Sequence, residues 1–157
     1  MAKILGYTLD YFNPKYLEQA LSHRSFSKKN NEKLEFLGDS VLSFVIASWL
    51  FNKFPQVSEG KLSRMRSQLV KGETLSAVAI HYNLGDHLKL GVGELKSGGH
   101  KRKSVLEDCV EAIFAAVLLD KGYRECEKFI LKIMEQWLAK VDPNISCLLY
   151  TSPSPRD

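Results

Sequence analysis

The sequence lacks the features of a cross-linked, zinc-bound or membrane-embedded protein. It holds three cysteines, Cys109, Cys126 and Cys147, whose spacing matches neither a disulfide framework nor a cysteine metal site, so a reducing compartment is expected. The longest apolar runs, FVIASWLF and AIFAAVLL, are far shorter than the roughly 18 residues of a membrane span. The N-terminal stretch MAKILGYTLDYF has no long apolar region typical of a signal peptide. We therefore expect a soluble, cytoplasmic protein with no membrane partner.

Two further absences narrow the fold class and the ligands. No segment alternates apolar and polar residues as a half-buried strand does. The glycine-rich stretch KLGVGELKSGGHKRKS, residues 89–104, does not match the phosphate cradle G-x-x-x-x-G-K-[ST], which argues against a nucleotide cofactor. Helical periodicity instead covers residues 14–23, 32–53, 58–70, 72–82, 104–121 and 123–139, with Ser104 and Glu107 as a capping box. At 157 residues, the sequence predicts one all-α domain.

The stretch NNEKLEFLGDS, residues 30–40, places three carboxylates at the start of a helix. With Glu32 at 0°, Glu35 falls at about 300° and Asp39 at about 340°, on one narrow face. The opposite side, at about 120° to 220°, carries the stripe expected to face the core: Leu34, Leu37, Val41, Phe44 and Val45. The three acids are either a solvated polar face or part of a site.

A second acidic pair favours a site. In SVLEDCVEAIFAAVLLDKGY, Asp108 and Glu111 lie three residues apart, off an apolar stripe formed by Leu106, Cys109, Val110, Ile113 and Val117. Small residues, Gly38 on the first helix and Ala112 and Ala115 on the second, would let the two helices approach closely.

Four converging carboxylates would repel one another unless cations lay between them. Oxygen ligands suit Mg²⁺, with Mn²⁺ as a substitute, and the absence of histidine from both clusters disfavours zinc and di-iron centres. Two such ions about 3.5 to 4 Å apart are the arrangement that assists phosphodiester hydrolysis. A metal-storage or di-iron bundle is the more distant alternative.

Basic residues could hold a polyanionic substrate near such a centre. The chain has 22 basic and 18 acidic residues, a net charge of +4 that permits a nucleic-acid partner without demonstrating one. Candidate phosphate contacts occur in two stretches: Lys61, Arg64, Arg66 and Lys71 in the first, and Lys96, Lys101, Arg102 and Lys103 in the second. Arg64 and Arg66 cannot share one helix face, and surface basic residues often serve solubility alone.

The order and spacing of these motifs resemble the ribonuclease III family of double-strand-specific RNA endonucleases. NNEKLEFLGDS matches the family signature, and the likeness continues through LSHRSF, FPQVSEGKLSRMRSQLV and LGVGELKSGGHKRKSVLEDCVEAIFAAVLLDKGY, over roughly residues 5 to 140. The resemblance implies the catalytic domain of that family, a hydrolase with a homodimeric helical fold. Its activity would be cleavage of double-stranded RNA to 5′-phosphate and 3′-hydroxyl ends, in ribosomal RNA processing and RNA turnover.

The resemblance also implies roles for individual residues. Glu35, Asp39, Asp108 and Glu111 match the metal-binding quartet, with Asp39 and Glu111 as catalytic acids and water as the nucleophile. Glu32 and Glu59 match supporting acids. Phe36, at about 40° and away from the core stripe, matches a position that inserts into the other subunit. His23 is expected to make hydrogen bonds at a helix end rather than bind a metal, and Trp49 and Trp137 to pack.

The C-terminal segment CLLYTSPSPRD, residues 147–157, differs from the rest of the sequence. It resembles the translation of a sequencing adapter, so we take the catalytic domain as residues 1–146, with a natural disordered terminus as the alternative. The family's double-stranded-RNA-binding domain would then be absent through truncation, or the chain would be a minimal nuclease. A non-catalytic RNA-binding module on the same fold is the main functional rival, and it would be expected to have lost the acids.

Overall fold

The computed structural model describes residues 2–144, and the 147–157 tail lies outside them. The helices are α1 (Pro14–Leu21), α2 (Glu32–Lys53), α3 (Glu59–Val70), α4 (Gly72–His81), α5 (Val92–Lys96), α6 (Lys103–Lys121), α7 (Tyr123–Ile133) and α8 (Glu135–Leu138). Short 3-10 turns cover Leu9–Tyr11, Leu84–His87 and Gly99–Lys101. The all-α prediction is confirmed.

A short hairpin at the N-terminus was not predicted from the sequence. Strands β1 (Lys3–Ile4) and β2 (Tyr7–Thr8) pair antiparallel through a turn in which Leu5 and Gly6 both have positive φ. Two residues per strand are too few to produce a visible alternation. The hairpin covers α7, where the rings of Tyr7 and Phe129 lie 4.9 Å apart.

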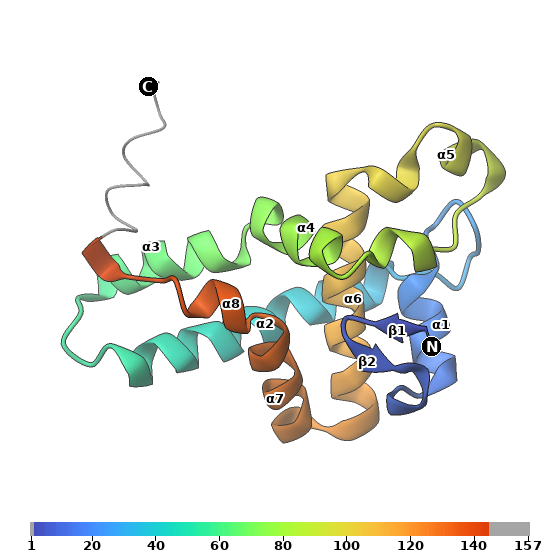
Figure 1. The fold of residues 1–157 in the computed structure, drawn as a ribbon. Helices are drawn as coiled ribbons and strands as arrows, with labels where there is room; N and C mark the ends of the chain where they lie inside the picture. The colour runs from blue at the N-terminus through green and yellow to red at the C-terminus, as the bar shows by residue number, and fades with distance from the viewer. Residues whose placement is uncertain (1, 145–157) are drawn as a thin grey trace.

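Helices α2 and α6 form the centre of the fold. In Figure 1, α6 runs through the middle of the molecule and α2 crosses it, with α1, α4 and α7 arranged around α6. Between Val105 and Val117, α6 is buried on almost every side, and the predicted stripe from Leu106 to Val117 is confirmed as core.

The crossing of α2 and α6 depends on Gly38. A Cβ atom built on Gly38 would lie 1.7 Å from the backbone oxygen of Glu111, so no other residue fits without moving one of the helices. The predicted close approach of the two helices is confirmed at this position. Because Gly38 lies between Glu35 and Asp39, the same contact brings these acids to the acidic part of α6.

The core-facing side of α2 is wider than predicted, and the assignment of Phe44 to it was wrong. Leu42 and Ile46 are fully buried, because α3 and α6 together cover the C-terminal half of this helix from more than one direction. Phe44 falls outside the covered arc and is 60% exposed, with its ring 5.7 Å from that of Tyr123. Glu35, at the edge of the widened arc, is consequently half-buried.

The predicted capping box was also wrong. Helix α6 begins at Lys103, its N-cap residue is Arg102, and no side chain caps it. The carboxylate of Glu107 lies instead against Gly72, at the start of α4. The predicted 89–104 loop contains one further short helix, α5, and a 3-10 turn.

By length and composition alone, α2 is the one helix among residues 2–144 that is apolar enough to cross a membrane. Its packing explains its composition differently. Seven of its residues are buried, and its polar positions near Gly38 carry the acids. Helix α2 is therefore a core helix of this fold.

We expect Gly38→Ala to destabilise the protein by at least about 3 kcal/mol, because the added methyl group meets a rigid backbone carbonyl. Gly60→Ala is the matched control, since Gly60 lies in α3 with nothing within 4 Å of an added Cβ, and it should stabilise by about 0.5 to 1 kcal/mol. Chemical denaturation measures both. A Gly38→Ala protein as stable as the parent would refute the role of this crossing.

Candidate metal centre

The start of α2 is held by the preceding segment. The side chain of Asn31 is buried and donates to the carbonyl oxygen of Ala20 at 3.1 Å, while its backbone N–H donates to Ser22 O at 2.9 Å. The Asn30 side chain accepts from the backbone N–H of Glu32 at 3.0 Å. These bonds fix where the helix begins, so the acids one and two turns later point in a defined direction.

Three carboxylates from the two central helices converge. One oxygen each from Glu35, Asp108 and Glu111 can be chosen so that all three lie within 4.8 Å of one another. Glu111 is 4% exposed, whereas the other two are half-buried. Asp39 is exposed but lies within hydrogen-bonding reach of the Glu111 carboxyl group. All four predicted acids therefore lie in one region at the α2–α6 crossing.

Burial and mutual repulsion make these groups reluctant to ionise. Burial is the main cause that raises the pKa of Glu111 far above its ordinary value, followed by interactions with Asp39 and Glu35. Burial, then the charges of Glu35, Glu107 and Glu32, raise the pKa of Asp108 to about 6. A positive charge placed among them would reverse this effect, because it would favour the ionised forms.

The donor set indicates which cation would fit. Every candidate ligand is a carboxylate oxygen, and neither histidine nor cysteine belongs to the group found in residues 2–144. Hard divalent ions such as Mg²⁺ and Mn²⁺ prefer these ligands, whereas structural zinc favours nitrogen and sulfur. The arrangement fits one or more hard cations held between α2 and α6.

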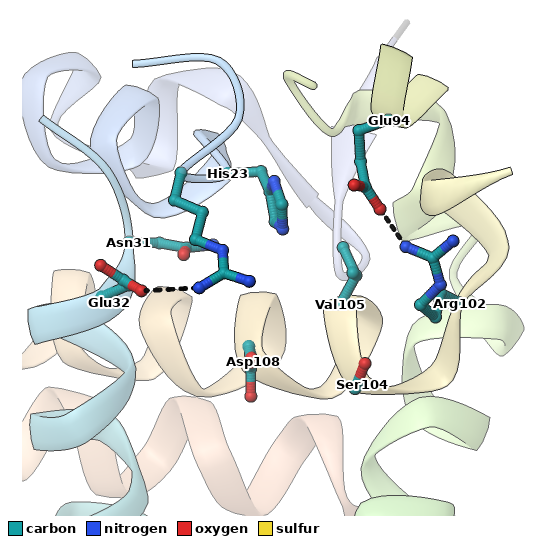
Figure 2. A pocket seen from close by; sticks show the side chains of 9 residues that line it. His23, Asn31, Glu32, Glu94, Arg102, Ser104, Val105 and Asp108 are labelled. Carbon is teal, nitrogen blue, oxygen red and sulfur yellow. Dashed lines mark hydrogen bonds and ion pairs between the residues drawn. The ribbon is translucent and has the colours of Figure 1, made fainter. Parts of the chain in front are cut away.

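A cavity of about 310 Å³ opens beside Asp108. Figure 2 shows Glu32 on one side of it, Glu94 with Arg102 on the other, and Asp108 between them. Arg24 also lines the cavity and pairs with Glu32 at 4.0 Å, while Arg102 pairs with Glu94.

Two of these wall residues, Arg24 and Glu94, were not predicted from the sequence. Nothing in the helical period marks them, because they lie in a loop and in the short helix α5. His23, which borders the same cavity, makes the hydrogen bond expected of it: its Nδ1 and the Ser25 hydroxyl lie 2.8 Å apart.

The two supporting acids lie in different places. Glu32 borders the cavity near Asp108, whereas Glu59 lies in the first turn of α3 and accepts a hydrogen bond from the Ser63 hydroxyl at 3.1 Å. Within residues 2–144 of one chain, Glu59 is not part of the converging group. Its supporting role stays a prediction.

The candidate phosphate contacts fall into two groups. On and after α3, Lys61 and Arg64 are partly buried, Arg66 borders a second cavity with Glu59, and Lys71 pairs with Glu73 at 3.7 Å. Around the start of α6, the side chains of Lys96, Lys101 and Lys103 are exposed, and Arg102 is held by Glu94. Of the second group, Lys103 is the first residue of α6, the helix that also carries Asp108 and Glu111.

The outer side of α2 carries an apolar stripe. Phe36, Phe44 and Phe51 are 75%, 60% and 71% exposed, and they fall within about 80° of one another around the helix. The placement of Phe36 away from the core is confirmed. Large aromatic side chains grouped on a surface are typical of a protein interface.

Comparison with known proteins identifies relatives over most of the described residues. The Ribonuclease-III-like family model matches residues 13–137. The chain is similar to Ribonuclease 3 of Buchnera aphidicola subsp. Acyrthosiphon pisum, with 52% identity over 141 residues, covering 90% of this chain and 62% of the relative. Ribonuclease 3 of Glaesserella parasuis is 59% identical over 122 residues, covering 78% and 54% respectively. The chain thus spans less than two thirds of the length of these curated relatives.

Solved structures give the same result. The nuclease domain of ribonuclease III from Campylobacter jejuni superposes with a TM-score of 0.79 and 39% identity, covering 84% of this chain and 92% of that one. That work describes a region of the C. jejuni domain involved in dimer formation. Dicer from Pichia stipitis superposes with a TM-score of 0.64 and 31% identity, covering 81% and 56%.

The raised pKa values predict a pH-dependent response to Mg²⁺. A carboxyl group with a folded-state pKa above its ordinary value stabilises the fold at low pH and loses that contribution as pH rises, through about 6 for Asp108. Mg²⁺ should therefore raise the unfolding temperature little at pH 5 and by several degrees at pH 8. Differential scanning calorimetry at both pH values measures this.

Glu111→Gln should raise the unfolding temperature of the metal-free protein at pH 8, because a buried carboxyl group whose pKa lies far above its ordinary value costs stability at that pH, and should abolish the Mg²⁺ response. Glu135→Gln, at an exposed position of α8, is the control that should change neither. A Mg²⁺ response independent of pH, or retained in Glu111→Gln, would contradict the assignment of the centre.

Proposed function

This chain belongs to the ribonuclease-III-like family, and from that premise we propose that it is a divalent-metal-dependent endoribonuclease that hydrolyses double-stranded RNA. The observation that carries the proposal is the convergence of Glu35, Asp108 and Glu111 at the α2–α6 crossing, with Asp39 beside them. A non-catalytic relative would have no reason to keep buried, mutually repelling acids, because they destabilise the metal-free fold.

In this proposal the four acids hold two Mg²⁺ ions, for which Mn²⁺ can substitute. Bound there, the ions would supply charge for the phosphodiester undergoing hydrolysis and lower the pKa of the attacking water. The protein's part is positioning: Gly38 sets the distance between the helices, and burial of Glu111 keeps its carboxylate in one place. Asp39, which is exposed, is the acid best placed to meet substrate and, with Glu111, is assigned the catalytic role. Glu32 and Glu59 are assigned supporting roles.

The substrate path follows from the charge of the surface around the acids. Lys96, Lys101 and Lys103 are exposed near the start of α6, where they could contact phosphates on either side of the cleaved bond. Arg102 is oriented by Glu94, and Lys61, Arg64, Arg66 and Lys71 would extend the contact along α3. The products would carry 5′-phosphate and 3′-hydroxyl ends. We place the activity in the cytoplasm, in ribosomal RNA processing and RNA turnover.

The activity is tested with the purified chain, a long double-stranded RNA and Mg²⁺. We expect cleavage that stops when Mg²⁺ is chelated and that falls at least about a hundredfold in Glu111→Gln, with circular dichroism confirming that the variant is folded. Glu135→Gln should cut like the parent. Equal cutting by parent and Glu111→Gln, or no cutting by a folded parent at low salt, would reject the proposal in favour of a non-catalytic RNA-binding module.

We also propose that the chain acts as a homodimer through the apolar stripe of α2. Phe36 is the most exposed of its three aromatic residues, and burying it would contribute about 1.5 to 3 kcal/mol. Phe36→Ala should therefore weaken dimerisation by at least about tenfold in sedimentation velocity. Ile80→Ala, a 58% exposed residue of α4, is the control expected to leave the dimer intact. A monomeric parent, or a Phe36→Ala dimer of unchanged affinity, would refute this interface.

A further inference from the structure

We propose that Glu107 is a fifth acid of the metal centre, a positioning residue that increases the affinity for Mg²⁺ from a place behind the ligating carboxylates. This inference rests on the proposed function. Glu107 belongs to neither the predicted quartet nor the two supporting acids, and the sequence suggested only a capping role for it. The structure assigns it a place beside the acids instead.

The position of Glu107 on α6 directs it toward the centre. It lies four residues before Glu111, hence on the same face of the helix and about one turn away. The side chain is half-buried, and its electrostatic partners are the charges of Glu35 and Asp39 across the helix crossing. Glu107 therefore contributes negative charge to the same region as the four converging acids.

Gly72 keeps the Glu107 carboxylate in this place. A Cβ atom built on Gly72 would lie 2.4 Å from Oε1 of Glu107 and 2.9 Å from Oε2, so the carboxylate occupies the space that a side chain would take. Gly72 is the first residue of the ten-residue helix α4, whose N-terminal end carries partial positive charge. The start of α4 thus contacts the carboxylate, and the charges of Glu35 and Asp39 on α2 act on the same group.

No cation within residues 2–144 neutralises this carboxylate. The six ion pairs of the described chain do not include Glu107, and no side-chain hydrogen bond to it is formed. Two consequences follow. The carboxylates of the metal-free centre repel one another more strongly than four acids alone would. The electrostatic free energy of binding a divalent cation there is correspondingly more favourable.

Glu107 acts through the other acids rather than as a ligand. The three oxygens within 4.8 Å of one another come from Glu35, Asp108 and Glu111, and Glu107 is outside that set and lacks the hydrogen-bonding reach to Glu111 that Asp39 has. A carboxylate that lies behind the metal ligands can orient a ligating group, or it can accept a hydrogen bond from a water molecule bound to the ion. Loss of such a partner commonly lowers metal affinity by about 10- to 100-fold.

The test is a Mg²⁺ titration of the full chain at pH 8 without RNA, with unfolding temperature and calorimetric binding as the readouts. Glu107→Gln should raise the Mg²⁺ concentration of half-saturation by about tenfold and leave the metal-free unfolding temperature equal or higher. Gly72→Ala keeps the charge but displaces the carboxylate, and we expect it to shift the half-saturation in the same direction. Glu73→Gln, which removes an exposed acid one residue further along α4, is the matched control and should bind Mg²⁺ like the parent.

Each outcome separates this inference from the proposed function. If the parent binds no Mg²⁺, the metal centre itself is wrong and both proposals fall. If the parent and Glu107→Gln bind Mg²⁺ equally, the metal centre stands and the role of Glu107 is refuted. A merely structural Glu107, supporting α4, would lower the metal-free unfolding temperature in Glu107→Gln without moving the half-saturation, which would also refute it.

Discussion

The close approach of α2 and α6 at Gly38 is the constraint on which the rest of the structure depends. It allows the backbone of one helix to touch the backbone of the other at Glu111, a distance that any side chain at position 38 would prevent. Because Glu35 and Asp39 flank that glycine, the same helix contact that packs the core also brings the acids together. Core packing and site geometry therefore cannot be altered independently at this crossing.

The same crossing explains why holding the carboxylates close together lowers the stability of the fold. Burial at the centre of the fold raises the pKa of Asp108 and Glu111, so the metal-free protein gives up stability at neutral pH in order to hold carboxylates close together. Proteins commonly retain such strain where a ligand relieves it. The surrounding apolar core of α6, buried from Val105 to Val117, provides the stability that tolerates it.

Much of this structure could be predicted from the sequence because its helices are long and their periods are clear. The predicted ranges for α2, α3, α4 and α6 agree with the structure to within one residue at each end, and the four acids predicted as metal ligands lie in one region, whereas Glu59 does not join them. The errors have a common cause: helix periodicity contains no information about neighbours. Phe44 has the angle of a core residue but stays 60% exposed beside the Tyr123 ring of α7, and Glu107 has the spacing of a capping residue but packs on Gly72. Arg24 and Glu94 were overlooked because loop residues meet only through tertiary contacts.

The division of the acids between two distant segments affects how the protein is made. Asp39 and Asp108 are 69 positions apart in the chain, so during synthesis α2 leaves the ribosome well before α6 exists. Until α6 has been translated and packed against Gly38, the acids of α2 have no partners with which to hold a cation. On the proposed function, a nascent chain emerging beside ribosomal and messenger RNA is inactive until α6 has packed against α2, because its metal centre is incomplete before then.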